Sequence, residues 1–242
     1  MTRRCRIEVA LFVAIVKAAR GSGVTTKETM MRTPKINDQI SPAEEASPAA
    51  PIRLYMSMSL DGFIAGPDDR AGQELGRNGG RLFNWLDDRL ASGPNGQVYA
   101  EALATGALIS GRRTYELAGR WGGDHHDGVP IHVLTHGVDE DDDRPDLVTY
   151  FDDVAACAAQ ARRAAGGRAV MVHGASAAQS LLAAGELDEL EIHLVPVLLG
   201  GGRRLFESLD GDRVELEHVR TIEGREATHL RYRVRRGDRS PS

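Results

Sequence analysis

The segment from Arg168 to Glu207 constrains the fold most, because it places a strand, a glycine turn, a helix and a second strand in succession. A short apolar run ends at His173-Gly174, and a helix pattern then opens at Ala175 and stops at Gly185. A second apolar run follows and ends at Pro196. The first N–H groups of a helix have no partner inside the helix, so this junction can hold a phosphate group. The segment therefore predicts a binding site for a nucleotide cofactor.

The same alternation of strands and helices runs through the rest of the chain. Apolar runs indicate strands at 52–58, 107–109, 130–134 and 147–151, and helical spacing indicates helices at 81–90, 97–105 and 154–165. Residues 213–222 and 226–234 alternate apolar and charged side chains, which is typical of a hairpin. Residues 63–65 are too few for an independent strand and are expected to be an apolar loop. The chain is predicted to be an α/β protein, with a mostly parallel central sheet, helices on both faces and a C-terminal antiparallel hairpin.

The composition separates one folded domain from its flanking segments. Residues 22–51 are rich in Ser, Thr, Pro, Ala and Glu, so the whole of 1–51 is predicted to be a disordered extension. The folded domain is expected over 52–236, with a polar tail at 237–242. The net charge of -5 gives no support for nucleic acid as a partner, and no apolar run is long enough to span a bilayer. Cys5 and Cys157 form no disulfide framework, which favours the reducing cytoplasm.

Glycines and polar residues follow three of the predicted strands. The Rossmann fingerprint is absent, because the glycine run 200–202 follows Pro196 and opens no long helix, and no Gly-Lys-Ser/Thr phosphate loop occurs. Ligands of an open α/β sheet collect at the carboxyl ends of its strands, where arginines add donors that suit a phosphate. The three junctions are Gly111-Arg112-Arg113-Thr114, Thr135-His136 and His173-Gly174-Ala175-Ser176. A plain turn with solvated arginines is an equal alternative for any one of them, but three together favour binding.

Other reactive side chains have simpler interpretations. The run 124–127, Asp-His-His-Asp, has the composition of a metal cluster, but adjacent histidines seldom converge on one ion. Its glycine-rich loop favours solvation, so no metal is expected. His193 is expected to be a core or surface histidine, and Cys157 has no partner histidine in its motif. Asp87 and Asp88 are expected to face water.

Five short motifs occur in a fixed order between residues 52 and 234. They are Ser57-Met58-Ser59-Leu60-Asp61-Gly62-Phe63-Ile64-Ala65, Ile109-Ser110-Gly111-Arg112-Arg113-Thr114-Tyr115-Glu116, Val133-Leu134-Thr135-His136, Val172-His173-Gly174-Ala175-Ser176 and Pro196-Val197-Leu198-Leu199-Gly200-Gly201-Gly202. The set resembles the dihydrofolate-reductase-like superfamily, most of all the reductase domain of bacterial bifunctional riboflavin-biosynthesis deaminase-reductases and their stand-alone relatives. The zinc deaminase signature is missing, so a bifunctional enzyme is not expected.

The resemblance implies a nicotinamide cofactor, NADPH, held by residues at the matching positions. By that resemblance Ser57 and Ile64 would flank the nicotinamide. The adenosine-side phosphates would be taken by Gly111, Arg112, Arg113 and Thr114, the adenine or 2′-phosphate by Thr135 and His136, and the pyrophosphate by Gly174, Ala175 and Ser176.

The implied reaction is hydride transfer to a small heterocyclic or ribosylamino-pyrimidine substrate, as in 5-amino-6-(5-phosphoribosylamino)uracil reductase of riboflavin biosynthesis. Asp61 is the acid beside the cofactor loop and is the candidate catalytic residue, with an Asp-Gly turn as an equal alternative. Two other functions stay open: a pterin reductase of the dihydrofolate type, and an NADP-binding module without catalysis. The resemblance also implies a homodimer.

Overall fold

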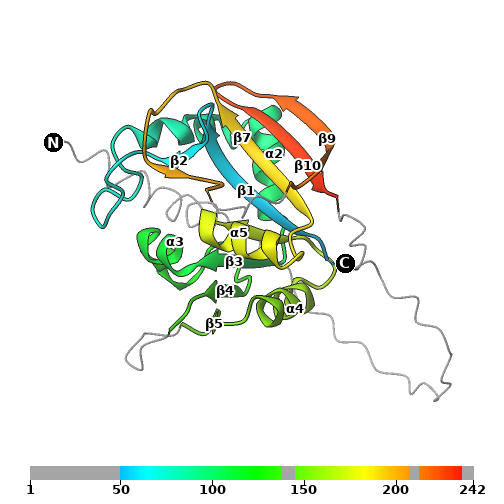
Figure 1. Ribbon diagram of the computed structural model, residues 1–242. Coiled ribbons are helices and arrows are strands. Elements are labelled where there is room, and N and C mark those ends of the chain that lie inside the picture. Colours follow the sequence, from blue (N-terminus) through cyan, green and yellow to red (C-terminus); the bar gives the residue numbers. More distant parts are fainter. Residues whose placement is uncertain (1–49, 138–144, 208–212, 236–242) are drawn as a thin grey trace, which may run out of the picture.

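One eight-stranded sheet carries the fold, in the strand order β5-β4-β3-β6-β1-β7-β10-β9 (Figure 1). The computed structural model describes residues 50–137, 145–207 and 213–235. The strands from β5 to β7 run parallel, and β9 and β10 form the predicted antiparallel hairpin, which β10 joins to the sheet by pairing antiparallel with β7. The strands of this sheet are β1 (Ile52–Ser59), β3 (Ala107–Gly111), β4 (Ile131–Leu134), β5 (Val148–Phe151), β6 (Val170–His173), β7 (Glu189–Val195), β9 (Leu216–Glu223) and β10 (Thr228–Val234).

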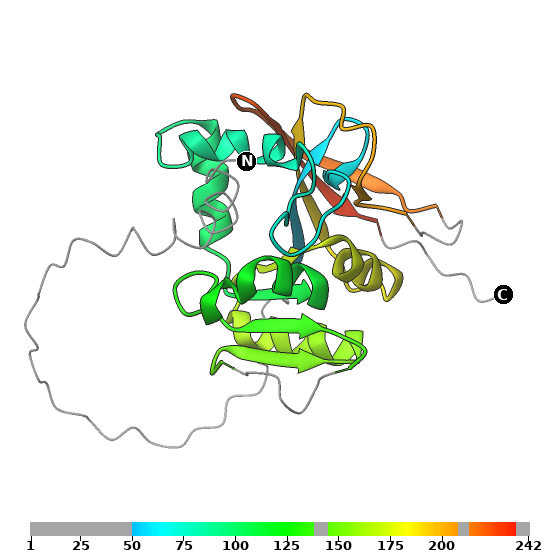
Figure 2. The same ribbon diagram turned by 90° about the vertical axis from the view of Figure 1, so that its left-hand side faces the viewer.

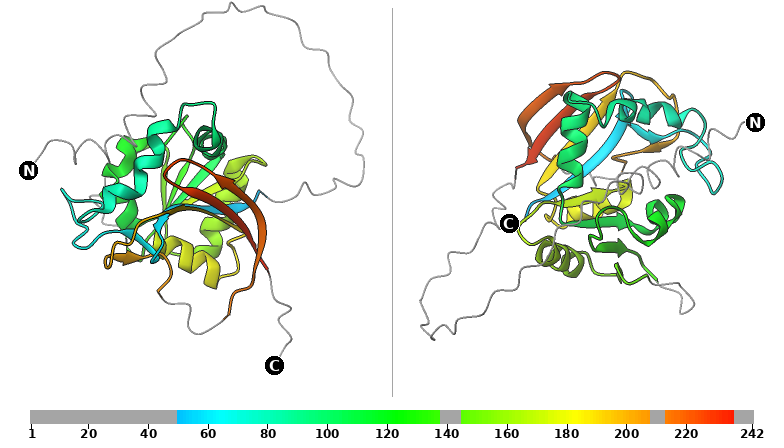
Figure 3. Two further views of the ribbon diagram at one scale, coloured as in Figure 1. Left: turned by 90° about the horizontal axis from the view of Figure 1, so that it is seen from above. Right: turned by 180° about the vertical axis from the view of Figure 1, so that it is seen from behind.

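Helices cover both faces of the sheet, because successive side chains of the central strands point to opposite sides. Leu54 of β1 belongs to the core cluster under α4 and α5, and its neighbour Tyr55 belongs to the cluster on the other face. Figure 2 shows α2 and α5 on opposite sides of β1, and the rear view in Figure 3 shows α2 lying over β7 and β10. The helical elements, with η for a 3-10 helix, are η1 (Gly79–Asp88), α2 (Pro94–Leu103), α3 (Arg112–Leu117), η2 (Gly119–Gly123), α4 (Val154–Ala165) and α5 (Ala175–Ala183).

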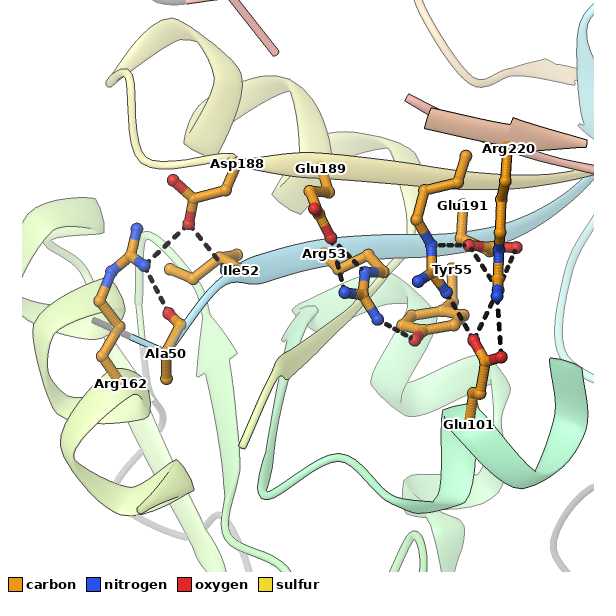
Figure 4. Close-up of polar contacts among 11 residues, drawn as sticks. Ala50, Ile52, Arg53, Tyr55, Glu101, Arg162, Asp188, Glu189, Glu191 and Arg220 are labelled. Carbon is orange, nitrogen blue, oxygen red and sulfur yellow. Dashed lines mark hydrogen bonds and ion pairs between the residues drawn. The ribbon is translucent and has the colours of Figure 1, made fainter. Parts of the chain in front are cut away.

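Charged side chains connect α2 to the antiparallel end of the sheet (Figure 4). The carboxylate of Glu191 on β7 is buried and accepts hydrogen bonds from Arg231 on β10 and Arg220 on β9. Both guanidinium groups also bind Glu101 on α2, at 2.5 Å from Arg220 and 2.8 Å from Arg231. The network keeps the buried carboxylate paired, which a buried charge requires, and holds the helix over the hairpin.

Two local predictions differ from the structure. Phe63–Ala65 is a strand, β2, and not a loop, because it pairs with β8 (Arg203–Arg204) from the far end of the chain. Leu90, the last residue of the helix predicted at 81–90, is 80% exposed, because η1 ends two residues before it. Of the extension predicted over 1–51, residues 1–49 lie outside the described residues, as does the tail predicted at 237–242, whereas Ala50 is buried in the core. No helix within the described ranges is long and apolar enough to cross a membrane.

Candidate active site

The three predicted junctions lie side by side, because β4, β3 and β6 are neighbours in the sheet. Gly111 at the end of β3 pairs in register with Leu134, the residue before Thr135. Ser110 pairs on the other side with His173, the residue before Gly174. Segments far apart in the sequence therefore meet along one edge of the sheet.

Close packing favours glycine at two of these junctions, and most strongly at Gly174. Gly174 has a φ of +94°, and a Cβ there would lie 2.3 Å from Thr114 Oγ1. A Cβ on Gly111 would lie 2.5 Å from Ser176 Oγ. The β3–α3 and β6–α5 turns are therefore in contact, because a side chain of each turn packs against the glycine of the other. The first-turn N–H groups of α5 begin at this contact and form a cradle that suits an anion.

Arg112 connects the third junction to the other two. Its Nη1 donates to the Gly137 carbonyl at 3.3 Å, and Thr135 Oγ1 donates to the same carbonyl at 2.7 Å. Its Nε donates to Glu116 at 2.6 Å. His136, next to Thr135, is exposed. A guanidinium, a hydroxyl and an exposed imidazole thus gather beyond the end of β4, and this chemistry suits a phosphate monoester.

Arg113 instead holds the loop that follows β2. Its Nη2 donates to the carbonyl of Asp69 at 2.6 Å and lies 3.3 Å from the Asp69 carboxylate. Arg203 of β8 binds the same carboxylate at 2.8 Å. Burial raises the pKa of Asp69, but the two guanidinium groups outweigh burial and the net pKa is lowered. Arg113 therefore holds a protein carboxylate, whereas a phosphate-binding role is what the sequence predicts for it.

A cavity of about 280 Å³ lies on the sheet face that carries α2 and α3. The predicted site residues that line it are Ser57, Ile64, Arg113, Thr114 and Gly174. Gly111, Arg112, Thr135, His136, Ala175 and Ser176 lie at the adjoining strand ends, outside its lining. Much of the wall is aromatic, with Tyr55, Phe83, Trp85, Tyr99 and Trp121. An aromatic wall beside a phosphate cradle suits a planar ligand.

Asp61 has a structural role outside this cavity. Its carboxylate accepts hydrogen bonds from Ser59 Oγ at 2.6 Å, from Leu199 N at 3.1 Å and from Gly200 N at 2.8 Å. The Ser59 hydroxyl, and then the backbone donors, lower the pKa of Asp61 to about 2. The structure therefore favours the turn interpretation of Asp61 over the catalytic one, since the side chain ties the loop after β1 to the loop after β7.

The acids of η1 separate into two environments. Asp87 is exposed, as predicted, but it also lines the cavity. Asp88 lies 3.8 Å from Arg225 and is not part of the lining. Asp87 is therefore the acid of the predicted set that can reach a bound ligand.

The histidines of the 124–127 run are buried, so the prediction of a solvated loop is wrong. The ring of Trp121 covers His125, with centroids 4.9 Å apart, and the Nδ1 atoms of His125 and His126 lie 2.6 Å apart. His125 lines the cavity together with His173, whose Nδ1 donates to the Tyr55 carbonyl at 2.9 Å. Burial lowers the pKa of His173 to about 4, so its ring is neutral. Among the described residues, no group of three His, Cys, Asp or Glu side chains could hold a metal ion.

His193 is buried on β7 and lines the same cavity. It packs on Trp85 with ring centroids 4.5 Å apart, and Trp85 Nε1 donates to Ser57 Oγ at 2.9 Å. Ser57 and His193 are partners in the register of β1 and β7. The sequence predicts a core or surface histidine here, and strand pairing is the signal that would have placed it beside Ser57.

These features define a dihydrofolate-reductase-like fold. The dihydrofolate reductase of Enterococcus faecalis, solved with NADP(H), superimposes with a TM-score of 0.51 at 18% identity, covering 77% of this chain and 97% of that one. A putative riboflavin biosynthesis protein from Shewanella sp. PV-4 gives a TM-score of 0.58 at 24% identity, covering 77% and 99%.

The family follows from the sequence match. Residues 50–228 match the RibD C-terminal domain, and the chain belongs to this family. Protein YwjB of Bacillus subtilis strain 168, which is uncharacterised, is 28% identical over 190 residues, or 74% of this chain and 95% of YwjB. The resemblance drawn from the five motifs is thereby confirmed.

Proposed function

We propose that this chain is an NADPH-dependent reductase that transfers hydride to a small heterocyclic substrate of the pyrimidine type, such as a ribosylamino-pyrimidine. The observation that carries the proposal is the contact of the two glycine junctions, Gly111 on Ser176 and Gly174 on Thr114, at the mouth of an aromatic cavity. Membership of the RibD C-terminal domain family supports a reductase.

The residues present fit the cofactor. Gly174, Ala175 and Ser176 would hold the pyrophosphate on the N–H groups of α5, at the turn where a Cβ on Gly174 would collide with Thr114. Arg112, Thr135 and His136 would take the 2′-phosphate. Ser57 and Ile64 line the cavity where the nicotinamide would enter.

The cofactor, when bound, supplies the hydride. The chain orients the acceptor and excludes water, and the aromatic wall with the neutral His173 serves both tasks. Asp87 at the cavity wall is the acidic residue we place beside the substrate, where its carboxylate can orient a water molecule that delivers the proton. Asp87 also favours a second candidate substrate, a pterin, because a carboxylate can bind the N–H donors of that ring.

Titration of the purified protein with NADPH tests the cofactor. The chain has two tryptophans, Trp85 and Trp121, and both line the cavity, so bound NADPH should quench their emission by energy transfer. Turnover is then followed as loss of nicotinamide absorbance with pyrimidine, pterin and quinone panels. Binding without turnover on any panel would favour a non-catalytic NADP-binding module, and no binding would refute the proposal. Light scattering tests the homodimer that the resemblance implies.

The Arg112→Ala variant tests the choice of NADPH over NADH. Loss of a charge-assisted contact to the 2′-phosphate should weaken NADPH binding about tenfold or more and leave NADH binding unchanged. Arg163→Ala is the matched control, because Arg163 lies on α4 and donates to Gln160. If the variant bound NADPH and NADH with equally reduced affinity, Arg112 would not be the residue that recognises the 2′-phosphate.

A further inference from the structure

A chain of three side chains leads from the interior to the cavity wall at His193. His193 Nδ1 lies 3.0 Å from Nδ1 of His229 on β10, and His229 Nε2 lies 3.0 Å from Asn95 Oδ1 at the start of α2. Asn95 Nδ2 donates to the carbonyls of Trp85 and Arg225, each at 3.0 Å. All three side chains are buried.

The carbonyls of Trp85 and Arg225 determine which nitrogen of His229 and of His193 carries a proton. A carbonyl only accepts, so the amino end of Asn95 faces Trp85 and Arg225 and its oxygen faces His229. His229 Nε2 therefore carries a proton and donates to Asn95. A neutral ring has one N–H, so His229 Nδ1 accepts from His193 Nδ1–H, and the lone pair of His193 is left on Nε2.

The surroundings keep both rings neutral and fixed. Burial, and then the nearby Arg220, lower the pKa of His229 to about 4, and burial with the neighbouring His229 lowers the pKa of His193 well below its ordinary value. Gly224, in the turn before β10, packs directly on the chain, since a Cβ there would lie 2.0 Å from Asn95 Oδ1 and 2.9 Å from His229 Nε2. Trp85 covers both rings, with centroids 4.5 Å from His193 and 5.0 Å from His229.

Two acidic side chains add further acceptors to the cavity wall. The carboxylates of Glu74 and Asp87 line it and only accept. The arginines of the lining already donate to protein oxygens: Arg113 and Arg203 to Asp69, and Arg89 to the Leu86 carbonyl.

We infer that His193 Nε2 is a fixed hydrogen-bond acceptor that selects planar heterocycles presenting an N–H donor, such as aminopyrimidines, with His229 and Asn95 as its positioning residues. The pyrimidine class rests on the proposed function, whereas the acceptor character of His193 does not.

Long-range proton–nitrogen NMR spectra of the histidine rings test the acceptor directly. We expect a neutral His193 protonated on Nδ1 and a neutral His229 protonated on Nε2, assigned by the signals lost in His193→Phe and His229→Phe. A His193 ring protonated on Nε2, or doubly protonated, would overturn the inference. In Asn95→Asp the carboxylate should favour a charged His229 that donates from both nitrogens, so that the proton of His193 moves to Nε2. A His193 signal unchanged in that variant would remove Asn95 as a positioning residue.

Ligand preference is measured by tryptophan quenching with 6-amino-1,3-dimethyluracil and 1,3,6-trimethyluracil, which lack ring N–H groups and differ by an amino group in place of a methyl group. The wild type should bind the amino compound about fivefold more tightly, the effect of one net hydrogen bond, and His193→Phe should bring the ratio close to one. His132→Phe is the control, because His132 is a buried histidine beside the Leu108 carbonyl and outside the cavity lining, and it should keep the ratio. An equal affinity in the wild type, or binding of neither compound, would overturn the inference.

The same samples are titrated with NADPH, which separates the two proposals. Cofactor binding without the ligand preference would leave the reductase assignment standing and refute the role of His193. A preference for the amino compound without NADPH binding would refute the reductase assignment and leave the role of His193 standing.

Discussion

Replacing Gly174 by Ala should damage both the fold and the cofactor cradle. The residue has φ +94° and ψ 146°, a region that only glycine adopts readily, so alanine there costs about 1–3 kcal/mol. The new Cβ would also lie 2.3 Å from Thr114 Oγ1 and 3.0 Å from Thr114 Cβ, which forces a shift that costs about 1–3 kcal/mol more. The free energy of unfolding should therefore fall by about 2–6 kcal/mol. NADPH affinity should fall roughly tenfold, the loss expected for one charge-assisted hydrogen bond.

Gly185→Ala separates the backbone cost from the clash. Gly185 also has a positive φ, +72°, but a Cβ there would meet nothing within 4 Å. This variant should lose only about 1–2 kcal/mol and bind NADPH as the wild type does. Adding Thr114→Ala to Gly174→Ala removes the oxygen that the new Cβ meets, so a double-mutant cycle should recover about 1 kcal/mol. The measurements are urea denaturation and NADPH titration. Equal losses at Gly174 and Gly185 would refute the packing argument.

Three further predictions concern single side chains. Asp61→Asn should lower the free energy of unfolding at neutral pH. The pKa of Asp61 in the folded protein, about 2, lies below the ordinary 3.8, so the difference between variant and wild type should shrink as the pH falls from about 4 to about 2. Denaturation curves that show a constant difference over this pH range would contradict the stabilising role of the Asp61 carboxylate. Glu191→Ala should cost about 3 kcal/mol in urea denaturation, because the half-buried Arg220 and Arg231 lose one of the two carboxylates that they bind, whereas Glu217→Ala in an exposed pair should cost under about 1 kcal/mol; equal costs would count against the network. Burial raises the pKa of Cys157 to about 12, so iodoacetamide should label the Cys5→Ser variant only after unfolding, and labelling of the folded form would show that the thiol is accessible.

Local signals were enough to predict most of the regular elements, though not β2 or β8. Helix α4 begins and ends at the predicted residues, because Asp153 accepts a hydrogen bond from Ala156 N and Gly166 adopts a left-handed conformation. The junction glycines at 111 and 174 were predicted in the same way, since each directly follows an apolar run and precedes a helix. Capping and turn chemistry act within a few residues, so a single sequence contains them.

The environments of polar side chains depended on partners that sequence proximity does not reveal. The Asp61 carboxylate is satisfied by Leu199 and Gly200, and β2 exists because of Arg203 and Arg204, all of them far along the chain. His125 lies in a polar, glycine-rich run, yet Trp121 encloses it. Periodicity describes which face of an element is apolar, and it does not say which distant ring will cover a loop.

The position of β1 at the centre of the sheet has a consequence for synthesis on the ribosome. Ile52 pairs with Val170, and Arg53 pairs with Glu189 on the other side, so both partners of the strand are made much later than the strand itself. At roughly 5–20 residues per second, both edges of this apolar strand stay unpaired for about 6–24 s while the intervening chain emerges. Such an edge is a template for association with other chains, so the nascent protein should depend on chaperones before β6 and β7 arrive. Moving the chain termini by circular permutation, so that β1 is made after β6, should shorten that exposure and raise the yield of folded protein.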